Sequence, residues 1–284
     1  MPTLWVLLNQ ITEELGSITD NPRFEAELLL AHVLEITRAE LLSRVKEEIN
    51  IPPEINKFVQ RRKNYEPIAY ILGYTEFFGL KIKTIPPIFI PRPETELLVE
   101  ETLKIIEEIS KKSINILELC TGTGCIPIAI LNNSNKKTKC ISVDINEKAA
   151  ILTKQNAKEN NVQINLIIGD LFSPINDKSK FDIILSNPPY ISEKSRNMIS
   201  PTIKDYEDSR AVFCKEDGTY IIRKIIEEAR YYLTMGGWLL LEMGDGQKYI
   251  VEKIFKENGY DNIKILFDLQ KLPRVIKGMW NQKI

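Results

Sequence analysis

The chain has 284 residues, of which 43% are hydrophobic and 27% charged, a composition typical of a globular protein rather than a disordered or fibrous one. Its 38 basic and 39 acidic residues give a formal net charge of −1, so no general affinity for nucleic acid and no direct DNA binding are expected. The single histidine, His32, and four cysteines without a C-x-x-C spacing argue against a histidine-activated nucleophile and a closed zinc site, and they favour the reducing cytoplasm.

The first 70 residues are predicted to form a bundle of helices. The start of the chain has a short apolar run without a basic flank, unlike a signal peptide, and no apolar stretch is long enough to cross a membrane. A first helix is predicted by residues at helical spacing, Trp5, Leu8, Thr12 and Leu15, and a second by an apolar face of Phe24, Leu28 and Ala31. We therefore expect a separate helical domain over residues 1–70.

A different pattern covers residues 71–90. Gly73 and Gly79 interrupt aromatic and β-branched residues, and apolar residues alternate with lysines from position 80 to position 84. This alternation predicts a short β-hairpin that connects two domains. The proline-rich segment 86–93 then marks a stiff junction.

From residue 91 to residue 284 the pattern alternates between strands and helices. Such alternation predicts an α/β domain with a doubly wound sheet and helices on both faces. Segments 164–168 and 181–185 are read as buried strands, and the last strand is expected to return antiparallel after Pro273. The predicted strands are 114–119, 140–143, 164–168, 181–185, 238–242, 263–268 and 275–280, and the main predicted helices are 146–160, 218–233 and 247–258.

The first candidate site is the turn after the first of these strands, where Gly122 and Gly124 would let the backbone approach a ligand. The third glycine of a dinucleotide fingerprint is replaced by Pro127, which argues against a pyrophosphate loop and a dehydrogenase. Asp144 ends the next strand, where a carboxylate can bind both hydroxyls of a ribose. The combination indicates a single nucleoside, with S-adenosyl-L-methionine as the obvious candidate; an ordinary α/β turn is the alternative.

Asp170 and Leu171 follow the third strand of this region. An adenine could be held there by its amino group and an apolar contact. By itself, Asp170 is better explained as the cap of a turn after Gly169.

The second candidate site is Ser186-Asn187-Pro188-Pro189-Tyr190, directly after the fourth strand. Prolines lack N–H groups and keep the preceding residue extended, so this turn presents carbonyl acceptors with few competing donors. The Asn187 side-chain carbonyl and the Pro188 backbone carbonyl can each accept one hydrogen of an –NH₂ group, which turns the nitrogen lone pair toward an electrophile. Tyr190 adds an aromatic face. An ordinary edge turn is the alternative, but the motif favours methyl transfer to a planar nitrogen without a histidine.

These segments together resemble the release-factor glutamine N(5)-methyltransferases, the HemK or PrmC family, over nearly the whole chain. Asn-Pro-Pro-Tyr is shared with adenine methyltransferases, whereas Pro-Arg-Pro-Glu-Thr-Glu beside this helical domain is much more specific. The resembling segments are residues 23–32, 67–73, 91–96, 121–124, 144 and 187–190.

The resemblance implies a Rossmann-like class I methyltransferase domain over residues 91–284 and a release-factor docking domain over residues 1–70. It implies transfer of a methyl group from S-adenosyl-L-methionine, with S-adenosyl-L-homocysteine as the product, to the glutamine of the Gly-Gly-Gln motif in class-1 peptide chain release factors. A monomer is expected. The expected cofactor site is Cys120, Thr121, Gly122, Thr123, Gly124, Asp144, Asp170, Leu171 and Asn187. The expected substrate site is Asn187, Pro188, Pro189 and Tyr190, with Asn187, Pro188 and Tyr190 as the catalytic residues.

Three residues depart from the family pattern. Leu171 stands where an aromatic residue is frequent, which predicts a weaker adenine contact. Asp208 follows Glu207 where proline is usual, which predicts a less rigid loop over residues 191–217. Cys120 replaces a commoner glycine and is expected to be tolerated.

Two rival functions stay open at this stage. An adenine N6 methyltransferase acting on DNA or RNA would need a basic groove or a target-recognition insertion, as well as a way to extrude the base. A non-catalytic adapter would carry a vestigial cofactor site, against which the intact Gly122, Gly124, Asp144 and Asn187 argue.

Overall fold

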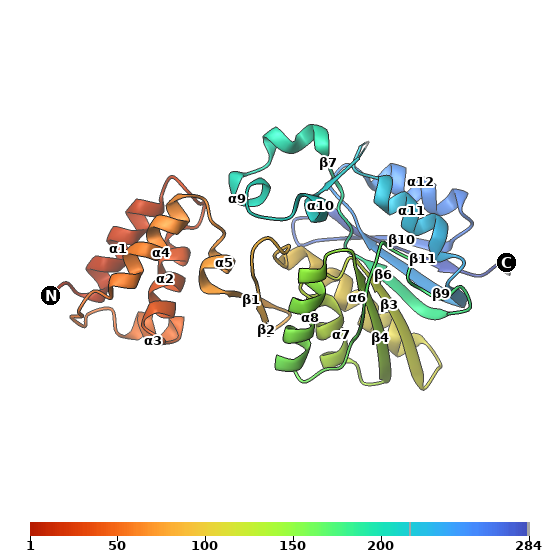
Figure 1. Cartoon of the computed structure of the whole chain (residues 1–284), viewed down its shortest axis with the longest axis horizontal. Helices are drawn as coiled ribbons and strands as arrows, with labels where there is room; N and C mark the ends of the chain where they lie inside the picture. The colour runs from red at the N-terminus through yellow and green to blue at the C-terminus, as the bar shows by residue number, and fades with distance from the viewer. Residues whose placement is uncertain (216, 283–284) are drawn as a thin grey trace. The chain divides into compact units, whose positions relative to one another are not determined.

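The computed structural model describes residues 1–215 and 217–282, and the chain divides into two compact units (Figure 1). The first unit comprises Met1–Tyr74 together with Ser200–Tyr206, and the second comprises Thr75–Ile199 and Glu207–Ile284. The ranges 191–217 and 91–284 named above therefore include positions outside the described residues. No helix among the described residues is both long and apolar enough to cross a membrane.

The first unit is a helical bundle. The hydroxyl of Thr3 accepts a hydrogen bond from the Val6 amide at the start of its first helix, and Thr37 caps the third helix in the same way through Glu40. Leucine-rich faces of the first two helices supply most of its buried core. The helices are α1 (Leu4–Leu15), α2 (Pro22–Val33), α3 (Arg38–Ser43), α4 (Pro53–Lys63), α5 (Ile68–Leu72) and, from the segment Ser200–Tyr206, α9 (Pro201–Lys204).

Two aromatic residues of the predicted helices lie outside this core. Trp5 is 50% exposed and Phe24 is 46% exposed. The guanidinium carbon of Arg23 lies 4.9 Å from the Trp5 ring centroid, and that of Arg38 lies 4.9 Å from Phe24. The expected apolar face with Phe24 is therefore wrong, because α2 turns a different set of side chains inward. The buried residues of α2 are Ala26, Glu27, Leu29, Leu30 and Ala31.

The predicted hairpin is confirmed as β1 (Tyr74–Phe77) and β2 (Leu80–Lys83). Asn156, a fully buried residue of α8 (Glu147–Glu159), fixes its second strand. The Asn156 side chain accepts a hydrogen bond from the Lys83 amide at 2.8 Å and donates to the carbonyls of Lys83 and Thr123. One buried amide thus ties the hairpin to the glycine turn.

A seven-stranded mixed sheet forms the centre of the second unit, in the order β10-β11-β9-β6-β3-β4-β5. The last strand pairs antiparallel with β9, as predicted. Leu119 pairs with Ser186, and Ser186 with Leu241, so the residues that follow these strands meet at one edge of the sheet. The strands are β3 (Ser113–Leu119), β4 (Lys137–Asp144), β5 (Asn165–Ile168), β6 (Phe181–Ser186), β9 (Leu233–Glu242), β10 (Asp261–Phe267) and β11 (Pro273–Trp280), besides the separate pair β7 (Ile191–Ser192) and β8 (Phe213–Cys214).

Helices cover both faces of this sheet, which confirms the doubly wound α/β fold (Figure 1). Leu117 and Leu119 of β3 belong to a core with α11 (Tyr220–Ala229) and α12 (Lys248–Glu257). Ile114 and Ile116 belong to a second core with α6 (Glu96–Glu108) and α7 (Cys125–Asn133). The alternation of side chains along β3 accounts for this division. The second unit also contains the short helices η1 (Pro93–Thr95), η2 (Glu193–Met198) and α10 (Ser209–Val212).

Two predicted elements differ from the structure. Segment 164–168 was predicted to be buried, but β5 is the edge strand and Ile168 is 52% exposed. The predicted helix 218–233 is too long, because α11 ends at Ala229. Leu233 fits the helical apolar period but starts β9, where it pairs with Phe181. Pairing with a neighbouring strand outweighs the local periodicity here.

Candidate active site

The first predicted motif forms the turn between β3 and α7. Cys120, Gly122 and Gly124 all have positive φ angles, of 61°, 58° and 79°. A Cβ atom on Gly124 would collide with Thr153, whereas a Cβ on Gly122 would meet no atom within 4 Å. Gly124 therefore serves close packing, and Gly122 borders open space at the carboxyl edge of the sheet.

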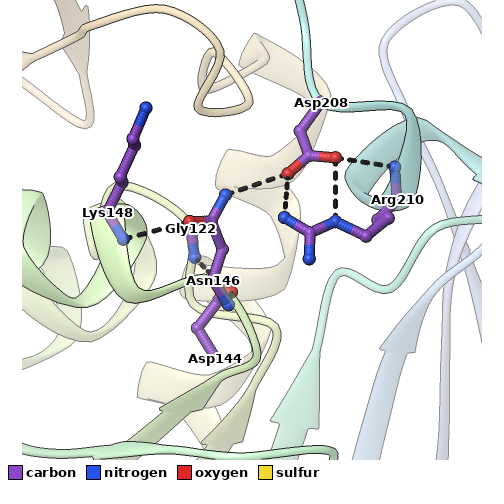
Figure 2. A network of polar contacts seen from close by, with 6 residues as sticks. All are labelled: Gly122, Asp144, Asn146, Lys148, Asp208 and Arg210. Atoms are coloured by element: carbon purple, nitrogen blue, oxygen red, sulfur yellow. Dashed lines mark hydrogen bonds and ion pairs between the residues drawn. The ribbon is translucent and has the colours of Figure 1, made fainter.

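Asp144, at the end of β4, faces this turn (Figure 2). Its Oδ2 accepts a hydrogen bond from the Gly122 amide at 2.8 Å, and its Oδ1 accepts one from the Asn146 amide at 2.8 Å. Burial raises the pKa of Asp144, and these two backbone bonds lower it in part. Each carboxylate oxygen keeps acceptor capacity, so the two hydroxyls of a ribose can still be bound. The open side of Gly122 and these acceptors fit a nucleoside.

Asp208 is connected to the same acid through Asn146 (Figure 2). The Asn146 side-chain amide donates to Asp208 Oδ2 at 2.9 Å, and the Arg210 guanidinium pairs with that carboxylate at 2.7 Å. The Asp208 amide donates to the Pro87 carbonyl at 2.7 Å. Hydrogen bonds therefore hold Asp208 at the position where a proline ring would restrict the backbone, and the lower rigidity expected for residues 191–217 stays a prediction.

Asp170 and Leu171 follow β5 beside the end of β4. The Gly169 amide donates to the Asp144 carbonyl at 3.0 Å, which brings this turn to the predicted cofactor site. Asp170 is exposed, and its backbone carbonyl accepts a hydrogen bond from the Ser173 amide. This bond is typical of a residue that begins a turn. Leu171 has a φ of 47° and lies mainly in the hydrophobic core.

Two other predicted cofactor residues, Thr121 and Thr123, are buried inside the glycine turn. The Thr121 hydroxyl donates to Glu118 Oε2 at 2.5 Å, and the Ser142 hydroxyl donates to the same oxygen at 2.7 Å. Burial raises the pKa of Glu118 to about 8. Glu118 is thus a buried acid behind the site, which the sequence prediction did not include. The sequence offered one signal that could have identified Glu118, namely an acidic residue near the end of an apolar strand.

The second predicted motif follows β6, the neighbour of β3 in the sheet. The Asn187 Nδ2 group donates to the hydroxyl of Thr95 at 3.1 Å. Among the described residues, none donates a hydrogen bond to Asn187 Oδ1. Pro188 is buried and Pro189 is half-buried. The Asn187 carbonyl therefore remains available as an acceptor for an incoming N–H group.

Tyr190 is held at both ends. Its hydroxyl donates to Glu242 Oε1 at 3.0 Å, and its backbone carbonyl accepts from Gln247 Nε2 at 3.0 Å. Gln247 Oε1 accepts in turn from the Gly244 amide at 2.8 Å. Burial raises the pKa of Tyr190, so the neutral phenol is strongly favoured. Thr95, Glu242 and Gln247 support the predicted motif, and none of them was predicted as a site residue.

Gly218 approaches the backbone of the same motif. A Cβ on Gly218, at a φ of 89°, would lie 2.1 Å from the Tyr190 carbonyl oxygen. We expect Gly218→Ala to destabilise the fold by about 2 kcal/mol or more, beyond the cost of the positive φ angle alone. Gly236→Ala is the matched control, because Gly236 has a φ of 78° and a Cβ there would meet no atom within 4 Å.

Calorimetric unfolding of both variants measures the difference. Equal destabilisation by the two alanines would contradict a specific contact between Gly218 and Tyr190.

Two family models match the chain: one described as PrmC N-terminal domain, over residues 6–73, and one described as Methyltransferase small domain, over residues 94–205. A release factor glutamine methyltransferase of Thermodesulfovibrio yellowstonii is 36% identical over 271 residues, covering 95% of this chain and 96% of the relative. A protein of the same name from Aliivibrio fischeri is 38% identical over 266 residues, covering 92% of each chain.

A similar fold is found in the solved structure of the hMettl16 catalytic domain in complex with the MAT2A 3′UTR hairpin 6. The TM-score is 0.59 at 14% sequence identity, and the match covers 78% of this chain and 84% of the other.

Proposed function

Because the chain belongs to the release factor glutamine methyltransferase family, we propose that it methylates the glutamine of the Gly-Gly-Gln motif in class-1 peptide chain release factors. The acceptor atom is the nitrogen of the glutamine side-chain amide, and the methyl donor is S-adenosyl-L-methionine. The observation that carries this proposal is the available Oδ1 of Asn187, fixed at the carboxyl edge of the sheet in the Asn-Pro-Pro-Tyr turn.

The residues around the glycine turn fit the cofactor. Bound S-adenosyl-L-methionine supplies a methyl group already activated by its sulfonium sulfur. Asp144 would bind the ribose hydroxyls, and the open side of Gly122 would give the nucleoside room. Leu171 and Asp170 would border the adenine, on the turn that hydrogen-bonds the end of β4.

The Asn187 turn orients the substrate amide. Asn187 Oδ1 and the Pro188 carbonyl would each accept one N–H of the glutamine side chain, so both hydrogens lie toward the protein. The nitrogen lone pair then points away from these acceptors and toward the methyl group. Tyr190, anchored to Glu242, would present its ring beside the amide or the sulfonium.

Proton removal needs no dedicated base in this scheme. The amide nitrogen carries its extra proton only after it has bonded to the methyl group, and a positively charged amide nitrogen is strongly acidic. The proton can pass to water or to an acceptor carbonyl. This agrees with a chain whose single histidine, His32, lies in the helical bundle.

The helical unit is the proposed docking surface for the release factor, since a Gly-Gly-Gln tripeptide offers little area for recognition. Trp5 and Phe24 support this assignment, because each is an exposed aromatic residue covered by an arginine. Aromatic residues and arginine are enriched at protein interfaces. We propose that the protein acts as a cytoplasmic monomer.

A labelled-methyl assay tests the function directly. The purified protein is incubated with S-adenosyl-L-methionine and an unmethylated class-1 release factor or, separately, adenine-containing DNA or RNA. One methyl group on the Gly-Gly-Gln glutamine, located by mass spectrometry, is expected. Label in nucleic acid alone would indicate an adenine methyltransferase, and binding of the release factor without any label would indicate an adapter.

A further inference from the structure

One short segment surrounds Tyr190, the aromatic residue of the proposed substrate turn. This segment, residues 242–247, ends β9 and leads into α12. Glu242 Oε1 accepts a hydrogen bond from the Tyr190 hydroxyl at 3.0 Å, and Gln247 Nε2 donates to the Tyr190 backbone carbonyl at 3.0 Å. A Cβ atom on Gly244 would lie 3.1 Å from Cδ2 of the Tyr190 ring. The hydroxyl, the backbone and the ring edge of Tyr190 therefore each meet a different residue of this segment.

Gln247 gives the segment a defined shape. It is buried, and both ends of its side-chain amide are used. Its Oε1 accepts from the Gly244 amide at 2.8 Å, and its Nε2 donates to the Asp217 carbonyl at 3.3 Å as well as to that of Tyr190. Gly244 is thus held in place independently of its contact with the Tyr190 ring.

Glu242 has a set of contacts that stability alone does not explain. It is 1% exposed, yet within the part of the chain that the structure describes only the Tyr190 hydroxyl hydrogen-bonds its side chain, and its Oε2 has no partner. Burying a carboxyl group with so few partners costs free energy, and an apolar side chain would fill the same space without that cost. The bond to Tyr190 is the contact that needs an acidic residue here.

This bond also decides what Tyr190 presents to a substrate. A phenol hydroxyl has one hydrogen, and here that hydrogen is directed to Glu242. It therefore does not compete with the glutamine for the carbonyl acceptors of the Asn187 turn. What Tyr190 offers to the substrate is its ring.

We propose that Glu242 and Gly244 are positioning residues that fix the Tyr190 ring for methyl transfer, Glu242 through the hydroxyl and Gly244 through the ring edge. Neither residue is assigned a contact with the reacting atoms, because each acts through Tyr190. This inference rests on the proposed function and adds to it the residues that set the aromatic wall of the substrate site.

A double-mutant cycle tests the bond between Glu242 and Tyr190. Glu242→Leu removes the acceptor, and Tyr190→Phe removes the hydroxyl but keeps the ring. Each is expected to lower kcat on the order of tenfold, with little change in KM for the release factor. Because both substitutions break the same bond, the double variant should be no slower than the slower single variant. Glu242→Gln keeps a carbonyl acceptor and should recover most of the rate.

The unfolding temperature separates positioning from stability. The double variant replaces both bonded groups by apolar ones, so it should unfold at no lower temperature than the wild type although it turns over more slowly. Tyr260→Phe is the matched control, because it removes a buried tyrosine hydroxyl that donates to the Ile226 carbonyl at 2.9 Å, outside the substrate turn. This control should lower the unfolding temperature and leave kcat unchanged.

Gly244→Ala tests the ring contact without removing a hydrogen-bonding group. The added methyl group would need the Tyr190 ring to move by a few tenths of an ångström, and kcat is expected to fall severalfold. Gly16→Ala is the control for an equally close contact elsewhere, because a Cβ there would lie 3.3 Å from the Glu13 carbonyl oxygen in the helical unit.

The outcomes separate this inference from the proposed function. Wild-type kcat in a folded Glu242→Leu variant, or losses that multiply in the double variant, would overturn the role of Glu242. Wild-type kcat in Gly244→Ala would overturn the role of Gly244. If the leucine variant does not fold, Tyr190→Phe decides, because an unchanged kcat there would show that the bond is not needed. A wild-type protein that leaves the release factor unmethylated would overturn the proposed function and this inference together.

Discussion

Replacing Asn187 with alanine is expected to lower kcat for release-factor methylation by 10²–10³-fold, on the order seen when a preorganised active-site hydrogen bond is removed. The variant lacks Oδ1, the side-chain acceptor for one N–H of the glutamine, and leaves the Pro188 carbonyl to hold the amide alone. Affinity for S-adenosyl-L-methionine should stay largely intact, because Asp144 and the glycine turn belong to other strands.

Single-turnover rates at saturating substrate, together with calorimetric titration of the cofactor, measure both quantities. Asn176→Ala is a suitable control, because Asn176 lies in the loop before β6 and its side chain accepts only from the nearby Lys178 amide. A wild-type rate in Asn187→Ala would contradict the orienting role. Loss of cofactor binding in the same variant would instead assign Asn187 to the cofactor site.

Much of the fold follows from the sequence, because strands such as β3, β6 and β9 are compact apolar runs and helices such as α11 and α12 are amphipathic. The antiparallel return of the last strand was predicted after Pro273, and β11 starts at that residue. The exposure of β5 was not predicted, since an apolar run does not reveal whether a strand lies at the centre or the edge of a sheet. Sheet order comes from packing between distant segments.

The candidate site shows the same division between local and distant information. Asp144 and Asn187 directly follow apolar strands, and parallel strands bring such residues to one edge of the sheet. Thr95 and Glu242 are different, because they contact the motif across 92 and 52 positions of the chain. Their residue types are ordinary for a helix start and a strand end. Only the arrangement in space shows that Thr95 bonds the side chain of Asn187 and that Glu242 bonds the hydroxyl of Tyr190.

Asp144→Asn is expected to weaken S-adenosyl-L-methionine binding by about tenfold to hundredfold, the range that corresponds to losing one hydrogen bond to a charged group. The asparagine is isosteric but has one acceptor oxygen, whereas Asp144 accepts from both the Gly122 and Asn146 amides. One of these amides would face the Nδ2 group, which also cannot accept from a ribose hydroxyl. At saturating cofactor, kcat should approach the wild-type value.

Cofactor titration and kcat at saturation check this expectation, and Asp177→Asn supplies the control for the same substitution at an exposed loop position. Unchanged cofactor affinity in Asp144→Asn would remove Asp144 from the ribose site. The expected pattern is the reverse of that for Asn187→Ala, with affinity lost and turnover kept. Such opposite effects would mean that the strands β4 and β6 present separate binding groups, one for the methyl donor and one for the amide that receives the methyl group.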